Sequence, residues 1–194
     1  MIKDIRKNLK RTAQKTLINN NQEDIPLRIK ISRRIWANYN PKVDSKKGFF
    51  DMKRRIYLET NEFRKLHNIP ILTINRNLAY EAQKQANYLA QINRMAHDRR
   101  NNVNKWGENL AMGSLSVAHF GVRRWYNEIK NYNFDNPKYK KGIGHFTQLV
   151  WKNTKQVGCG VAFNGKIVYT VCKYYPPGNY IGQFRQNVPR PMYE

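Results

Sequence analysis

The amino-acid sequence predicts an α+β domain in which helices precede strands. Apolar residues recur at helical spacing before Pro137, glycines and β-branched residues follow it, and Asn164-Gly165 predicts a hairpin turn between residues 157–163 and 167–174. Helical segments followed by strands are typical of the α+β class. The apolar positions of the three expected helices are Met52, Ile56, Leu58, Phe63 and Leu66, then Leu78, Ala82, Ala86, Leu89 and Ala90, then Val117, Phe120, Val122, Trp125, Ile129 and Tyr132.

Positive charge dominates the composition. The 194 residues include 36 Lys and Arg against 13 Asp and Glu, a formal net charge of +23. This imbalance predicts attraction to anionic lipid, glycan or nucleic-acid surfaces. No specific nucleic-acid binding is expected, because the sequence has no zinc-finger, recognition-helix or stacking motif. No transmembrane segment is expected either, because no apolar run reaches about 18 residues.

Three parts of the chain differ in composition. We expect residues 1–50 to form a basic N-terminal extension, residues 51–187 to form the folded domain, and residues 188–194 to form a C-terminal tail. The extension carries the densest positive charge, so it is the part expected to meet an anionic surface first.

Within the extension, residues 1–20 have a thin amphipathic pattern that suits a helix on a membrane surface, and a solvated or disordered tail fits the same pattern. Residues 25–36 alternate apolar and basic side chains, which predicts a strand-like or adhesive segment. Residues 37–50 have the composition of a linker. The cations expected at an anionic surface are Lys3, Arg6, Lys7, Lys10, Arg11, Arg28, Lys30, Arg33 and Arg34.

Two motifs follow one another in the second half of the chain. GHFTQLVWKNT spans residues 144–154, and VCKYYPPGNY spans residues 171–180. Together they resemble the signature motifs of the CAP superfamily, which contains cysteine-rich secretory proteins, antigen 5 and plant pathogenesis-related class 1 proteins. Residues 125–134 are most similar to the Golgi-associated plant pathogenesis-related-like branch. The resemblance covers about residues 52–187 and implies a three-layer α-β-α sandwich with a central antiparallel sheet.

Four ionisable residues interrupt apolar segments: His97, Glu108, Glu128 and His145. Buried carboxylates and imidazoles need partners, and these four could bind a divalent metal or share protons. The resemblance places them at the positions of a family tetrad that lines a central cavity. It implies zinc or magnesium there, with His97 and His145 as ligands, but no required cofactor and no catalytic residue. Hydrogen bonding that only supports the cavity wall is the alternative.

The chain has two cysteines, Cys159 and Cys172, on either side of the predicted turn. A two-residue turn would leave them diagonal to each other, about 7–8 Å apart and too far for a disulfide. A four-residue loop from Asn164 to Ile167 would place them directly opposite and permit the bond. The sequence leaves both arrangements open, with and without the disulfide.

Three functions are compatible with the sequence. The leading hypothesis is a non-enzymatic protein that binds lipids or sterols at anionic membranes, where each Lys or Arg contributes about 1 kcal/mol. Relatives in the Golgi-associated branch can dimerise, so a second copy of the chain is another expected partner. The alternatives are a secreted interaction or immune-modulating protein of the venom-allergen kind, and a metal-assisted hydrolase with Glu108 or Glu128 as base.

Two observations on cellular location conflict. The first residues lack the apolar core of a signal peptide, whereas most members of the resembled superfamily are secreted. We expect an extracellular protein on the strength of the family. The alternative is a peripheral membrane protein on the cytosolic face of the Golgi.

Overall fold

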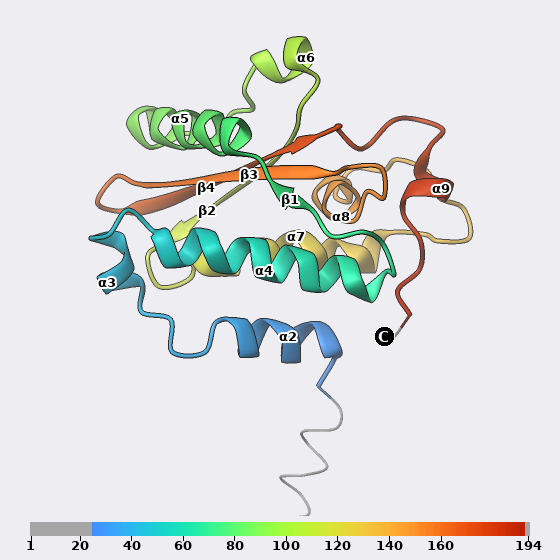
Figure 1. Ribbon diagram of the computed structural model, residues 1–194, viewed down its shortest axis with the longest axis horizontal. Helices are drawn as coiled ribbons and strands as arrows, with labels where there is room; N and C mark the ends of the chain where they lie inside the picture. The colour runs from blue at the N-terminus through green and yellow to red at the C-terminus, as the bar shows by residue number, and fades with distance from the viewer. Residues whose placement is uncertain (1–24, 193–194) are drawn as a thin grey trace, which may run out of the picture.

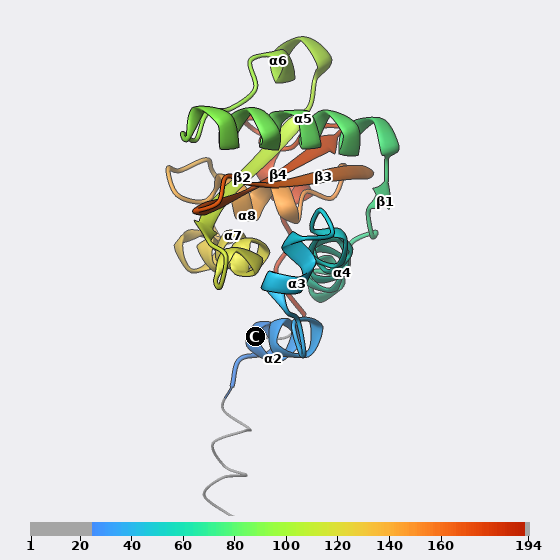
Figure 2. The same cartoon turned by 90° about the vertical axis from the view of Figure 1, so that its left-hand side faces the viewer.

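A four-stranded sheet forms the middle layer of the molecule (Figures 1 and 2). The structure is a computed structural model, and it describes residues 25–192. The strands are β1 (Thr73–Ile74), β2 (Gly107–Ser114), β3 (Gln156–Phe163) and β4 (Ile167–Tyr175), in the order β1-β3-β4-β2. β4 is antiparallel to both neighbours, and β1 pairs with β3 in parallel. The predicted α+β class is confirmed, with one parallel edge strand added to the antiparallel sheet.

One face of the sheet is covered by α5 (Arg76–Ile92), which lies across β3 and β4 (Figure 2). Two glycines of β3 permit this contact. A Cβ on Gly158 would lie 2.0 Å from the backbone nitrogen of Ala79, and one on Gly160 would lie 2.3 Å from the Cα of Gln83. The helix can therefore approach the strand more closely than any larger residue would allow. The apolar face of α5 is buried as the sequence predicts, at Leu78, Ala82, Ala86 and Leu89.

The opposite face carries α4 (Phe50–Leu66), α7 (Gly121–Asn127) and α8 (Gly144–Leu149), which completes three layers (Figure 2). The third helix predicted from the sequence is not continuous. It consists of η1 (Ala118–Phe120), α7 and η2 (Glu128–Asn131), because the chain tightens to 3-10 turns at both ends of α7.

The predicted first helix corresponds to α4, and most of its expected apolar positions are in the core. Met52, Ile56 and Phe63 are buried, as is Leu66 at the end of the helix. Leu58 is 46 % exposed, so this apolar position lies outside the core. The reason is geometric, since a residue two positions from Ile56 points to the opposite side of the helix.

A buried arginine joins α4 to the loop after α8. Arg64 is fully buried and donates hydrogen bonds to the backbone carbonyls of Pro70, Leu149, Trp151 and Thr154. Burial lowers the pKa of Arg64 to about 10, which still leaves the guanidinium charged at neutral pH. One side chain thus satisfies four carbonyl groups that water cannot reach.

The segment before the predicted domain is helical, so the strand-like prediction for residues 25–36 was wrong. It forms α2 (Leu27–Ile35), which packs under α4 (Figure 1). The apolar residues of this segment also recur every four positions, which is helical spacing, and Ile31 joins the main core. Trp36 anchors the helix, because its indole donates a 2.8 Å hydrogen bond to the Glu59 carboxylate. Burial raises the pKa of Glu59 to about 7.

The segment predicted as a linker, residues 37–50, contains α3 (Pro41–Ser45). Asn40 caps the first turn of α3 with its side chain. Asp44 is buried, and its carboxylate accepts hydrogen bonds from two backbone N–H groups at the start of α4. The predicted linker is therefore part of the folded structure, and it caps the helix that follows it.

Residues 188–192, the described part of the predicted tail, are also attached to the domain after α9 (Phe184–Asn187). His67 donates from Nδ1 to the carbonyl of Pro189 and accepts at Nε2 from the Tyr126 hydroxyl. Burial lowers the pKa of His67 to about 4, so the ring is neutral at physiological pH and can make both bonds.

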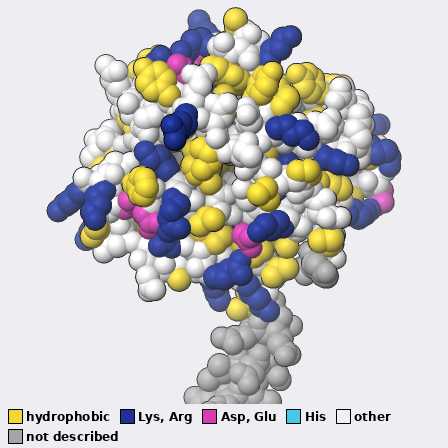
Figure 3. Space-filling view, viewed as in Figure 1, with side chains coloured by type: hydrophobic (Ala, Val, Ile, Leu, Met, Phe, Trp, Pro, Cys, Tyr) yellow, Lys and Arg dark blue, Asp and Glu magenta, His cyan; other side chains and the backbone are white. Residues whose placement is uncertain are grey.

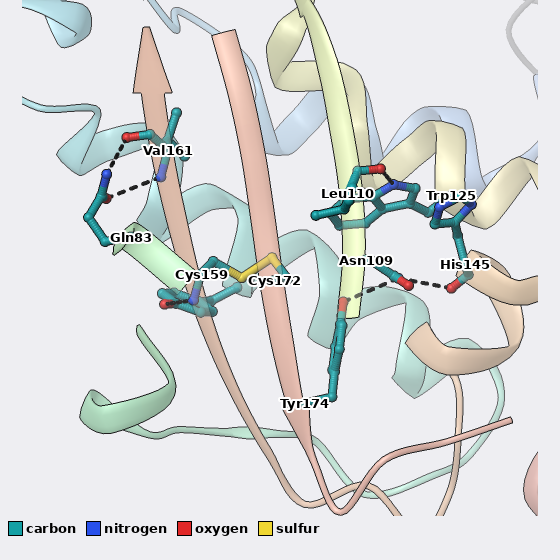
Figure 4. The surroundings of a disulfide bond; sticks show 10 residues. Gln83, Asn109, Leu110, Trp125, His145, Cys159, Val161, Cys172 and Tyr174 are labelled. Carbon is teal, nitrogen blue, oxygen red and sulfur yellow. Dashed lines mark hydrogen bonds between the residues drawn. A yellow bond between two sulfur atoms is a disulfide. The ribbon is translucent and has the colours of Figure 1, made fainter. Parts of the chain in front are cut away.

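Cys159 and Cys172 form a disulfide between β3 and β4 (Figure 4). The two residues are directly opposite in the strand register. The last pair in the β3–β4 register is Phe163 with Val168, so the four residues Asn164 to Ile167 connect the paired positions, and the N–H of Asn164 donates a 3.2 Å hydrogen bond to the carbonyl of Ile167. The structure thus has the four-residue loop, which is the alternative that permits the bond.

Candidate functional site: two histidine–glutamate pairs

The first pair joins the loop before α6 (Arg100–Asn104) to β2. His97 Nδ1 donates to Glu108 Oε1 over 2.7 Å, and the same oxygen accepts from the backbone N–H of Asp98. The hydrogen bond to Glu108 raises the pKa of His97 above its ordinary value. Burial alone would raise the pKa of Glu108, but His97 and the charge of Lys173 outweigh it and lower that pKa. The pair therefore favours an imidazolium beside a carboxylate.

A lysine that the sequence analysis did not select lies at the centre of this pair. Lys173 faces Glu108 across the β2–β4 register and is fully buried. Its Nζ lies 3.2 Å from Glu108 Oε2, 2.9 Å from Asp98 Oδ2 and 2.5 Å from Asn101 Oδ1. Burial opposes ionisation of Asp98, but hydrogen bonds from Arg100 and Lys173 hold its pKa well below the usual range. Two carboxylates thus share one buried ammonium group.

The second pair has a different environment. His145 Nδ1 donates to Glu128 Oε1 over 2.7 Å. The other carboxylate oxygen accepts from the backbone N–H groups of His145 and Phe146 at the start of α8. Burial would raise the pKa of Glu128, but its hydrogen bonds lower that pKa. Glu128 is therefore both the partner of the imidazole and an anionic cap on a helix N-terminus.

Strand alternation explains why the four residues form two pairs. Glu108 and Asn109 are neighbours on β2, so their side chains point to opposite faces of the sheet. Glu108 reaches Lys173 on one face. On the other, Asn109 donates to the backbone carbonyl of His145 (Figure 4). The ring of His145 stacks against Trp125, with centroids 6.3 Å apart.

The two residues of the first pair border different cavities. A cavity of about 590 Å³ between α5 and α6 includes His97, and a polar cavity of about 360 Å³ includes Glu108. The linings of these two cavities do not include Glu128 or His145.

The residues do not match a metal site well. Within residues 25–192, no group of three or more His, Cys, Asp or Glu side chains is arranged to hold a metal ion. Each imidazole uses Nδ1 on its own glutamate and, among the described residues, keeps Nε2 free, but Lys173 supplies a cation 3.2 Å from Glu108. A divalent ion would have to compete with that ammonium for the carboxylate. Metal binding by His97 and His145 stays a prediction, and we derive no chemistry through it.

Of the cations predicted to meet an anionic surface, those on α2 can be placed. Lys30 and Arg33 are exposed, whereas Arg34 pairs with Glu62 over 2.7 Å. Arg28 is half-buried beside a small apolar cavity. The predicted cations outside the described residues are Lys3, Arg6, Lys7, Lys10 and Arg11. Across residues 25–192, the helices are too short or too polar to cross a bilayer.

Three residues of the cluster around Glu108 were not predicted from the sequence: Lys173, Asp98 and Asn101. The sequence does contain a feature that could have identified Lys173, because it is the one charged residue of its strand and lies between Cys172 and Tyr174. A lysine at such a position needs a buried anionic partner. Only the register of β2 against β4 identifies that partner as Glu108.

Comparisons with known proteins agree with this fold. The chain is 42 % identical over 132 residues to the human Golgi-associated plant pathogenesis-related protein 1, which covers 66 % of this chain and 86 % of the relative. It is 38 % identical over 141 residues to protein PRY2 of Saccharomyces cerevisiae, covering 71 % of this chain and 41 % of PRY2. Venom allergen 5 of Polistes gallicus is 40 % identical over 111 residues, covering 50 % of this chain and 53 % of the allergen.

A solved structure has the same fold, and a family profile identifies the family. Venom allergen-like protein 4 of Schistosoma mansoni superposes with a TM-score of 0.57 at 26 % identity, covering 72 % of this chain and 96 % of the other. The profile of the cysteine-rich secretory protein family, CAP, matches residues 57–174. This chain therefore belongs to the CAP family.

Proposed function

We propose that this protein is a non-enzymatic CAP-domain protein that binds anionic membranes and their lipids or sterols. The observation that supports this function is the imbalance of charge in the folded part. Residues 25–192 contain 30 Lys and Arg but only nine Asp and Glu. Such an imbalance produces a positive field over the surface.

The acidic residues are committed to partners within the protein. Seven of the nine are in ion pairs with Lys, Arg or His, and the other two, Asp44 and Glu59, accept internal hydrogen bonds. Many exposed cations have no carboxylate within ion-pair distance in the described residues. They include Lys30, Arg33, Lys42, Lys46, Lys47, Lys138, Lys140, Lys141, Lys152, Lys155 and Lys166.

The test is co-sedimentation of the full chain with phosphatidylserine-containing and pure phosphatidylcholine vesicles, with and without ergosterol, at low and high salt. We expect binding to the acidic vesicles at low salt, because each Lys or Arg at the surface contributes about 1 kcal/mol. The charge-reversed variant Lys140→Glu/Lys141→Glu should bind more weakly. Equal binding to acidic and neutral vesicles, or none to either, contradicts the proposal.

We also propose an extracellular location, which the disulfide supports. Cys159 and Cys172 are bonded, and disulfides persist in oxidising compartments. One relative is named for the Golgi and another for venom, so the names of the relatives do not decide between a Golgi and an extracellular location. Alkylation and mass spectrometry of protein from its native source, without reductant, tests this. Two alkylated cysteines in that sample would contradict an extracellular location.

A further inference from the structure

Two tyrosines and a lysine form an exposed row along α5. Tyr80, Lys84 and Tyr88 are spaced four residues apart, so they share one face of the helix. Tyr80 is 63 % exposed and Tyr88 is 50 % exposed. The ammonium group of Lys84 lies 5.3 Å from the ring centroid of Tyr80. The outer face of α5 therefore presents flat aromatic rings beside a positive charge.

A cavity of about 590 Å³ continues this row past the end of α5, and its volume is within the range of small-ligand sites. Its lining includes Lys84 and Tyr88 of α5 and two arginines of the following loop, Arg94 and Arg99. Figure 3 shows Lys and Arg side chains at the top of the molecule, over α5 and α6. We call the set of Tyr80, Lys84, Tyr88, Arg94 and Arg99 the α5–α6 surface.

The two arginines of the α5–α6 surface have no acidic partner. In the described chain, no carboxylate lies within ion-pair distance of Arg94 or Arg99. The cavity lining has one carboxylate, that of Asp98, and both Arg100 and the buried Lys173 bind it, over 2.8 and 2.9 Å. This carboxylate is therefore already neutralised, and the guanidinium groups of the two arginines are available to an anion.

Lys84 shares its only ion-pair partner with a second cation. Its Nζ lies 3.3 Å from Glu81 Oε1, and the other oxygen of Glu81 binds Arg100 over 2.9 Å. One negative charge thus serves two positive ones. The α5–α6 surface as a whole keeps an excess of positive charge, which attracts anionic ligands.

The loop that carries the arginines is fixed to the rest of the fold on both sides of its centre. The buried side chain of Gln85 donates a 2.9 Å hydrogen bond to the carbonyl of Ala96. The backbone N–H of Asp98 donates to the carboxylate of Glu108. The backbone positions of both arginines are therefore set before a ligand binds, which reduces the entropy lost on binding.

The shape of the α5–α6 surface indicates the class of ligand. Tyr80 and Tyr88 lie about 12 Å apart along the helix axis, and the arginines lie beyond them. A single charged headgroup would occupy one point of this row, whereas a sulfated sugar chain supplies rings and negative groups at repeated intervals. Single-stranded nucleic acid also combines rings with charge. The disulfide favours the sugar, because it indicates an oxidising compartment, where cell-surface glycans are exposed.

We infer that the α5–α6 surface binds a sulfated sugar chain, with sugar rings on Tyr80 and Tyr88 and sulfate groups at Lys84, Arg94 and Arg99. The inference rests on the proposed extracellular location. It goes beyond the proposed membrane function, because it assigns a different ligand to a surface that does not have to contact a bilayer.

The first test measures the affinity of the full chain for a heparin tetrasaccharide by calorimetry. We expect saturable binding to the wild type and a loss of about tenfold or more in Arg94→Ser/Arg99→Ser, because charged hydrogen bonds to sulfate are lost. Both arginines are exposed, so the fold should be preserved, which circular dichroism checks. The matched control, Lys53→Ser/Lys130→Ser, removes the same charge outside the cavity and should change the affinity by less than about twofold.

A second measurement separates the rings from the charges. The affinity of each protein is measured at several salt concentrations. We expect Tyr80→Ser/Tyr88→Ser to bind about threefold to tenfold more weakly with an unchanged slope of log affinity against log salt, because stacking involves no released counterion. Arg94→Ser/Arg99→Ser should reduce that slope.

Four outcomes would overturn the site. They are absent binding to the wild type, equal losses in Arg94→Ser/Arg99→Ser and its control, equal binding of the tetrasaccharide after removal of its sulfate groups, and tighter binding of a single-stranded oligonucleotide of equal charge. The other proposals fail separately. Vesicle co-sedimentation tests the membrane function, and alkylation of the native protein tests the extracellular location, neither of which uses the tetrasaccharide.

Discussion

The two histidine–glutamate pairs have the same 2.7 Å hydrogen bond but different surroundings. In the first, the His97 side chain is 64 % exposed while Glu108 is buried against Lys173. In the second, His145 and Glu128 are both partly buried, and Glu128 accepts backbone N–H groups of α8. One carboxylate is neutralised by a buried lysine, and the other by a helix N-terminus.

The comparison shows that two histidine–glutamate pairs with the same hydrogen bond are stabilised in different ways. Glu108 depends mainly on another ionised group, so removal of its cation leaves charge buried. Glu128 depends mainly on fixed backbone dipoles, so its removal leaves N–H groups without an acceptor. The predictions below test this difference, from the largest expected effect to the smallest.

Replacement of the buried lysine should be the most damaging change. In Lys173→Met, Asp98 and Glu108 would lose their shared ammonium, and we expect the free energy of unfolding to fall by about 3–5 kcal/mol. Urea denaturation at neutral pH measures this. Lys166→Met, at an exposed position of the hairpin turn, should change the stability by no more than about 0.5 kcal/mol. A loss below about 1 kcal/mol in Lys173→Met would mean that the carboxylates do not depend on it.

Loss of the second carboxylate should have a smaller effect. We expect Glu128→Ala to lower the free energy of unfolding by about 2 kcal/mol, because the charged hydrogen bonds at the start of α8 are lost. Glu128→Gln keeps an acceptor and should cost less. Since the pKa of Glu128 is lowered by folding, its contribution is present above the unfolded pKa and is lost as the pH falls through the folded pKa. The wild type should therefore be more stable than Glu128→Ala at neutral pH, and the two proteins should have similar denaturation curves at acidic pH.

The two histidines should also differ from each other. His145→Ala removes the stacking on Trp125 and the partner of Glu128, and we expect a loss of about 1–2 kcal/mol. His97→Ala leaves Glu108 paired with Lys173, so we expect a loss below about 1 kcal/mol. The loss of stability in each variant is measured by thermal unfolding under identical conditions. Equal losses would contradict the difference in surroundings.

The smallest effect concerns the titration of His97. Its pKa is raised by Glu108, so its contribution to stability is fully present below the unfolded pKa and is lost as the pH rises through the folded pKa. NMR titration of the ring should give a pKa above 6.5 in the wild type and a lower value in Glu108→Gln. An unchanged His97 pKa in that variant would show that another group raises it.

Much of the fold follows from local patterns in the sequence. The apolar spacing of α5 and the turn residues between β3 and β4 predict those elements, because helices and hairpins depend on nearby residues. The segment now seen as α2 was misread, because its apolar residues fit both a period of two and a period of four. Packing of Ile31 and Trp36 against α4 selects the helix, and that contact is not visible in a local pattern.

By itself the sequence determined the family, the excess of positive charge and the presence of four ionisable residues in apolar segments. The tertiary structure decided how those residues pair, because the strand register brings Lys173 to Glu108 and places Asn109 on the other face. It also decided that the cysteines meet and that charged side chains of α5, α6 and the loop between them line one cavity. Composition and spacing fix which groups are available, whereas burial and register fix which groups meet, and both depend on contacts far apart in the chain.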